Sequence, residues 1–139
     1  MAYSLLGYSR STHSPASAVR VRTSSAQRRA LLIAACLLAV GAAAMLGHPA
    51  DYLRDDPALA RLLRCMALIK GVIVMAAAAA VFWRFGWSIA KPMAAIYVLA
   101  SAVMAGSTLL IWQLTLIPLA AFLFHAAALS LLVVGWRER

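Results

Sequence analysis

Charged side chains are scarce in this chain of 139 residues, where Asp, Glu, Lys and Arg together make up 12% and hydrophobic residues 65%. Soluble globular domains hold about 25% charged residues and ~45–50% apolar ones. A soluble protein of this length with so few polar side chains could not cover its own core. The composition therefore excludes an ordinary soluble domain and predicts an all-α integral membrane protein.

Motifs that carry chemistry are also lacking. The two cysteines, Cys36 and Cys65, lie in or beside different apolar runs, without a CxxC spacing or a nearby histidine that would complete a zinc site. No Asp or Glu lies inside an apolar run, although cation-driven carriers and intramembrane hydrolases usually depend on buried carboxylates. We therefore assign no catalytic residue and no metal ligand, and we expect no cofactor.

Positive charge is in excess, because the chain has 13 Lys and Arg residues but only 4 Asp and Glu residues, which gives a formal net charge of +9. In a soluble chain this excess would suggest nucleic acid as a partner. Here the basic residues flank apolar runs instead of forming one exposed face. The charge therefore indicates orientation in a membrane, and we expect no nucleic acid partner.

Four apolar runs are long enough to cross a bilayer. At about 1.5 Å per helical residue, even the shorter runs reach across most of a ~30 Å hydrocarbon core. The short turn near residues 113–117 permits only an antiparallel hairpin. We predict an antiparallel bundle of four transmembrane helices within residues 30–139, with spans at about 30–47, 65–83, 92–112 and 118–134.

Prolines mark where the later helices begin. Asp56 followed by Pro57 is typical of a helix N-cap with proline at the first helical position, so the second helix is expected to begin ahead of its membrane span. Pro92 and Pro118 indicate the starts of the third and fourth helices in the same way. An alternative for the first run is cleavage by signal peptidase at residues 42–44, which would still leave three spans.

The segment before the first run, residues 1–29, is rich in Ser and Thr and contains no acid. It lacks the apolar content to fold alone, so we expect a disordered basic tail. Each arginine near an anionic leaflet adds about 1 kcal/mol of attraction, which makes anionic lipid an expected partner of the tail. An organellar transit peptide has a similar composition and is an alternative. The arginines are Arg10, Arg20, Arg22, Arg28 and Arg29.

The distribution of basic residues predicts the topology. The tail, the connection with Arg84 and Lys91, and the C-terminal end all lie on one side of the predicted spans, and they carry most of the basic residues. By the positive-inside rule both termini are cytoplasmic. We expect the plasma membrane, that is a bacterial inner membrane, with an organellar inner membrane as the alternative.

Two further patterns fit a bundle in lipid. Tryptophans at the ends of the predicted spans are typical of the aromatic belt at a membrane interface, and these are Trp83, Trp87, Trp112 and Trp136. Small residues recur at helical spacing on the first and third helices, which lets helix backbones approach closely. The small residues are Ala35, Ala39, Ala43 and Gly47, and then Ala94, Ala102 and Gly106.

Only two ionisable side chains, Lys70 and His125, fall inside predicted spans, and such residues are functional candidates because they are expensive in lipid. Lys70 either extends to the outer surface or faces the bundle, where Ser107 and Thr108 lie at similar depth. His125 lies near the middle of the membrane and cannot reach the surface. We expect it to form a hydrogen bond to another helix, with Ser101 at a suitable depth.

Three functions follow from this pattern. The first is a non-enzymatic accessory, assembly or scaffolding subunit of a larger membrane complex, whose partner is another membrane protein or further copies of the chain. The second is an oligomeric small transporter or channel subunit for an anion or a proton, using Lys70 and His125. The third is a redox subunit with haem at His125, which would need a second histidine from a homodimer or a partner.

Overall fold

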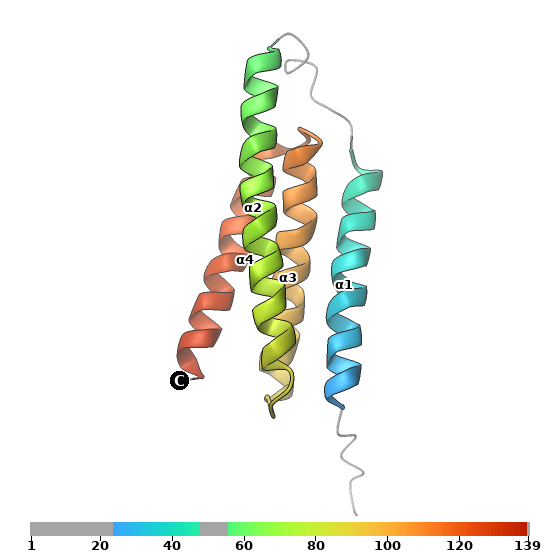
Figure 1. Cartoon of the computed structure of the whole chain (residues 1–139), viewed down its shortest axis with the longest axis vertical. Helices are drawn as coiled ribbons and strands as arrows, with labels where there is room; N and C mark the ends of the chain where they lie inside the picture. Colours follow the sequence, from blue (N-terminus) through green and yellow to red (C-terminus); the bar gives the residue numbers. More distant parts are fainter. Residues whose placement is uncertain (1–23, 48–55, 139) are drawn as a thin grey trace, which may run out of the picture.

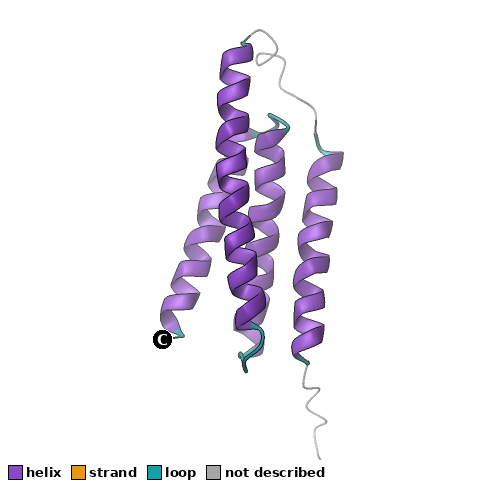
Figure 2. Ribbon diagram, in the orientation of Figure 1, coloured by secondary structure: helices purple, strands orange, loops and turns teal. Residues whose placement is uncertain are grey.

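The computed structural model describes residues 24–47 and 56–138, and all regular structure in these residues is helical (Figure 2). The four helices are α1 (Ser25–Met45), α2 (Pro57–Arg84), α3 (Lys91–Trp112) and α4 (Ile117–Arg137). Each is long and apolar enough to cross a membrane, which confirms the four predicted apolar helices and suggests a multi-pass membrane protein. Most of the predicted tail and the connection from α1 to α2 lie outside the described residues.

Local capping explains where α1 and α2 begin. The side chain of Ser24 accepts a hydrogen bond from the Gln27 amide at 3.1 Å, so α1 begins at Ser25 instead of Ala30 and residues 25–29 are helical. Asp56 accepts hydrogen bonds from two amides of the first turn of α2, at 3.1 and 3.0 Å. The predicted start of α2 at Asp56 and Pro57 is therefore confirmed.

Helix α3 lies at the centre and packs against α1, α2 and α4, whereas the other three helices make few close contacts with one another (Figure 1). Each of the three core clusters contains residues of α3, for example Tyr97, Met104 and Ile111. Helix α2 is the longest, and its first turns extend beyond the ends of α1 and α3 (Figure 1). The fold is therefore a bundle organised around one helix.

Helices α1 and α3 run in the same direction and come closest at two small residues. A Cβ atom added to Gly106 of α3 would lie 3.2 Å from the carbonyl oxygen of Ala39 and 3.4 Å from its Cβ atom. A Cβ atom at these distances would be tighter than most real contacts, so the glycine favours this close approach of backbones, which is typical of helices that associate in lipid. The contact fixes the distance between α1 and the rest of the bundle.

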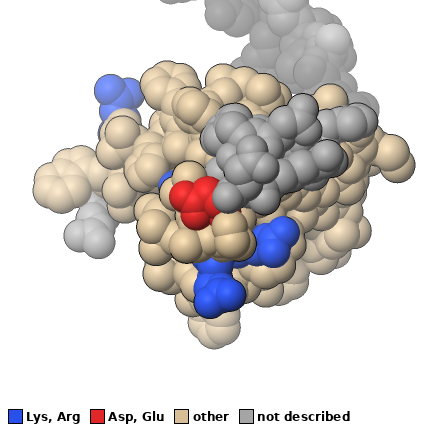
Figure 3. Space-filling model, turned by 90° about the horizontal axis from the view of Figure 1, so that it is seen from above, with Lys and Arg blue, Asp and Glu red and all other residues tan. Residues whose placement is uncertain are grey.

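The two ends of the bundle differ in charge. The starts of α1 and α3 and the ends of α2 and α4 lie together, and we call this the basic end (Figure 1). Its described basic residues are Arg28, Arg29, Arg84, Lys91 and Arg137. Figure 3 views the opposite end, where the described residues show a few charged side chains among uncharged ones. All four tryptophans are exposed near one end or the other, with Trp136 the most exposed at 78%.

We predict that Gly106→Ile separates α1 from α3, because the added side chain meets the Ala39 backbone at once. Overpacking of this kind lowers the free energy of unfolding by about 1–3 kcal/mol. The measurement is thermal unfolding of the purified full chain in detergent, followed by circular dichroism. The matched control is Gly41→Ile on α1, where an added Cβ has nothing within 4 Å. Equal unfolding temperatures for the two variants would contradict the Ala39–Gly106 contact.

Candidate functional site

Lys70 is half-buried on α2, and its Nζ atom lies 4.5 Å from the centre of the Phe124 ring on α4. A cation over an aromatic face is attracted by the ring quadrupole. The hydroxyls expected near Lys70 are engaged within α3, because Ser107 donates to the Val103 carbonyl at 2.6 Å and Thr108 to the Met104 carbonyl at 2.9 Å. The contact that the structure gives Lys70 is therefore with an aromatic ring.

His125 and Ser101 do not meet. Ser101 is 1% exposed on α3, and its hydroxyl has no hydrogen-bond partner among the described residues. His125 is exposed on α4, next to the buried Phe124, and its Nδ1 atom lies 2.7 Å from the carbonyl oxygen of Ala121 one turn earlier. The expected hydrogen bond between the two helices is thus replaced by one within α4, because α4 presents Phe124 to the core instead of His125.

The partner of Nδ1 determines the tautomer of the His125 ring. A carbonyl oxygen only accepts, so Nδ1 carries the hydrogen and donates to Ala121. In the neutral ring Nε2 is then an acceptor. His125 therefore offers one hydrogen-bond acceptor on the exposed side of α4.

His125 belongs to a stripe of exposed residues on α4 that recur at alternating steps of three and four. This spacing of about 3.5 residues is that of the seam along which two helices pack. We call these residues the His125 stripe: Phe122 (69% exposed), His125, Leu129 (61%), Leu132 (68%) and Trp136 (78%). Helix α4 thus has a second packing face that no described helix covers.

A polar cluster at the basic end was not anticipated from the sequence. Glu138 forms an ion pair with Arg84 at 3.1 Å and accepts a hydrogen bond from the Tyr97 hydroxyl at 3.0 Å. One carboxylate thereby joins the ends of α2 and α4 to α3, and we call this group the Glu138 clamp. The available signal was that Glu138 is the one acid in the sequence after Asp56, and it lies among the basic residues that end the chain.

Arg29 joins α1 to the same end. Its guanidinium lies 4.7 Å from the centre of the Phe82 ring, and its Nε atom donates to the Phe82 carbonyl at 3.3 Å. The carbonyl belongs to the last turn of α2, where cations interact favourably with the helix dipole. All four helices are therefore connected at the basic end by polar contacts.

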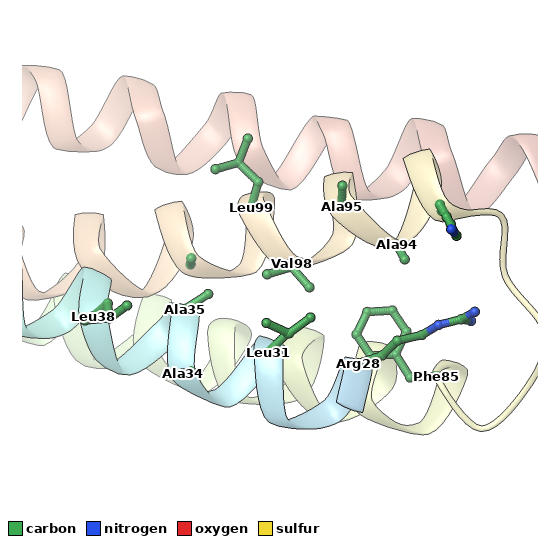
Figure 4. A pocket seen from close by; sticks show the side chains of 12 residues that line it. Arg28, Leu31, Ala34, Ala35, Leu38, Phe85, Ala94, Ala95, Val98 and Leu99 are labelled. Atoms are coloured by element: carbon green, nitrogen blue, oxygen red, sulfur yellow. The ribbon is translucent and has the colours of Figure 1, made fainter. Parts of the chain in front are cut away.

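Two clefts open beside these contacts. One of about 350 Å³ lies between α2 and α4 and includes Arg84, Tyr97 and Glu138 in its lining. A larger groove of about 540 Å³ runs between α1 and α3 (Figure 4). Within residues 24–47 and 56–138 no group of three or more His, Cys, Asp or Glu side chains is placed to hold a metal ion.

No protein-family model matches the chain, and no curated protein or solved structure is significantly similar to it.

We predict energetic coupling between Tyr97 and Glu138. Because the hydrogen bond goes to a charged group in a half-buried setting, the double-mutant cycle of Tyr97→Phe and Glu138→Ala should give about 1 kcal/mol of interaction free energy in the stability of the full chain. Unfolding in detergent is the measurement. The control cycle combines Tyr97→Phe with Arg137→Ala, for which we expect additive effects. Additivity in both cycles would show that the clamp does not hold the helices together.

Proposed function

We propose that this chain is a non-enzymatic accessory, assembly or scaffolding subunit of a membrane complex and that it docks on its partner through the His125 stripe. The observation that carries the proposal is the exposure of His125 on the outer face of an apolar helix. The exposed polar atom lies within a row of large apolar side chains spaced for helix packing.

The depth of His125 makes its exposure expensive in lipid. If α4 crosses the membrane, His125 lies about 12 Å from the Ile117 end and about 18 Å from the Arg137 end. An imidazole is too short to reach either surface from there. Polar groups within spans almost always face protein or a water-filled cavity. A partner helix over the stripe removes this penalty by supplying a hydrogen bond.

The tautomer of His125 favours an unrelated partner over a second copy of the chain. Two copies related by a twofold axis would bring the two His125 rings to the same depth, and both Nε2 atoms would be acceptors. The partner helix must instead offer a donor, such as a hydroxyl or an amide N–H. We therefore propose a different membrane protein, with a Ser, Thr, Tyr, Asn or Gln facing His125.

The alternative of a transport path is less well supported, because it requires Lys70 and His125 to face a common interior. Lys70 lies over Phe124, whereas His125 is on the outside of α4. A haem iron bound to the exposed Nε2 atom of His125 would need a second axial ligand from another copy of the chain or from a partner protein. The accessory role needs neither a path nor a second ligand.

For orientation, we propose that the basic end faces the cytoplasm, as the positive-inside rule indicates for Arg28, Arg29, Arg84, Lys91 and Arg137. A plasma membrane of the bacterial inner type is the expected site, and an organellar inner membrane fits the same charge distribution. The arginines of the tail would then lie beside the anionic leaflet.

We predict that His125→Leu leaves the insertion and the unfolding temperature of the chain unchanged but weakens the binding of the partner protein. Loss of one interhelical hydrogen bond of about 1–2 kcal/mol weakens association about tenfold. The measurement is gentle extraction of the tagged chain from its own membranes, followed by native mass and a visible absorption spectrum. The control Ser130→Ala alters an exposed hydroxyl of α4 that donates to its own helix at Ala126.

The outcomes separate the three functions. A stoichiometric unrelated protein that is retained with Ser130→Ala and lost with His125→Leu supports the accessory role. A colourless homo-oligomer, unchanged by His125→Leu, overturns it and favours the transporter. A Soret band that disappears with His125→Leu also overturns it and identifies His125 as a haem ligand.

A further inference from the structure

No residue of α4, and therefore none of the His125 stripe, lines the groove between α1 and α3. Figure 1 shows α1 and α4 on different sides of α3. The groove's volume of about 540 Å³ falls within the range of small-molecule sites, roughly 300–1,000 Å³. Its walls are mostly alanine, leucine and valine side chains of the two helices, and Figure 4 shows Val98 of α3 and Leu31 of α1 pointing into the gap between them. Small side chains such as Ala34, Ala35 and Ala95 leave the space open.

The groove has one open, charged end and one closed end. Arg28 and Lys91 lie at the basic end, together with the fully buried Phe85. At the other end the groove stops where Gly106 meets the Ala39 backbone. From Arg28 to the last lining residue of α1, Leu38, the groove extends about 15 Å. This is half of a ~30 Å hydrocarbon core, or the depth of one leaflet.

This shape fits a lipid chain better than a helix. A transmembrane helix is about 10 Å wide and continues across the whole ~30 Å core, so it would extend past the Ala39–Gly106 contact without a groove to receive it. An acyl chain is thin and ends within one leaflet. Its headgroup then lies at the membrane surface, at the level of the two cations.

We propose that the α1–α3 groove binds one anionic glycerophospholipid, with an acyl chain between the two helices and the phosphate beside Arg28 and Lys91. Charge complementarity selects the headgroup, since each basic side chain near the surface strengthens the binding of an anionic lipid about fivefold. The apolar walls hold the chain irrespective of the headgroup.

The neighbouring residues Arg28 and Arg29 make different contacts. Arg29 is bound to the last turn of α2 through the Phe82 carbonyl and ring. This contact fixes the base of α1, so Arg28 is held at the mouth of the groove, where Figure 4 shows it beside Phe85. Of this pair, Arg29 thus holds the start of α1 against α2, and Arg28 lines the groove.

The test is native mass spectrometry of the full chain reconstituted with either phosphatidylglycerol or phosphatidylcholine of the same chain length. Ala95→Phe fills the groove and should weaken retention of both lipids about tenfold, because the chain loses its space. Arg28→Gln with Lys91→Gln should lower retention of phosphatidylglycerol to that of phosphatidylcholine. Matched controls are Ala79→Phe, an exposed alanine of α2 outside the groove, and Arg137→Gln, an exposed cation of the basic end.

Each outcome decides the proposal. Preferential retention of phosphatidylglycerol that falls in the groove variants and persists in both controls supports it. Equal retention of the two lipids by the parent, or no change with Ala95→Phe in a variant whose helical content matches the parent, overturns it. Specific disulfide crosslinking of Leu38→Cys to another protein in native membranes also overturns it, because a partner helix would then cover the groove. None of these results depends on His125, so the proposed accessory role succeeds or fails separately.

Discussion

The close approach of α1 to α3 at Ala39 and Gly106 is the constraint on which the rest of the arrangement depends. Helix α3 packs against all the others and is the main neighbour of α1, which also contacts the end of α2 through Arg29. In lipid there is little hydrophobic driving force between helices, so association rests on van der Waals contact and hydrogen bonds. The two small residues therefore allow α1 to pack closely against α3. They also lie where the α1–α3 groove ends.

Polar contacts between the helices complement this packing at the basic end. Arg29, Arg84, Tyr97 and Glu138 connect the four helices at the basic end, whereas the interior of the bundle contains mainly apolar side chains and hydroxyls bonded to their own helix. Charged groups are least expensive to pair where the helices leave the hydrocarbon region. The bundle is thus fixed by polar contacts at the basic end and by close packing along α3.

The number and the starts of the helices were predictable from the sequence, because apolar length and caps are local signals, as Asp56 and Pro57 illustrate. Which side chains face inward was not. A soluble helix marks its buried face by polarity, but these helices are apolar all round, so the expectation that His125 would face Ser101 had no directional signal behind it. Glu138 was missed for a related reason. Its partners lie on two other helices, 54 and 41 positions away, and only the packing around α3 brings them together.

The pairing of α1 with α3 also has a consequence for the order of assembly. Helices α2, α3 and α4 contact their sequence neighbours, so these contacts form as soon as each new helix is inserted. Helix α1 instead packs mainly against α3, which follows about 50 residues later, so this packing requires closure of a long loop. During synthesis the packing of α1 on α3 can therefore form only after α3 has been made, and until then α1 has, among the described residues, only its contact with the end of α2 through Arg29.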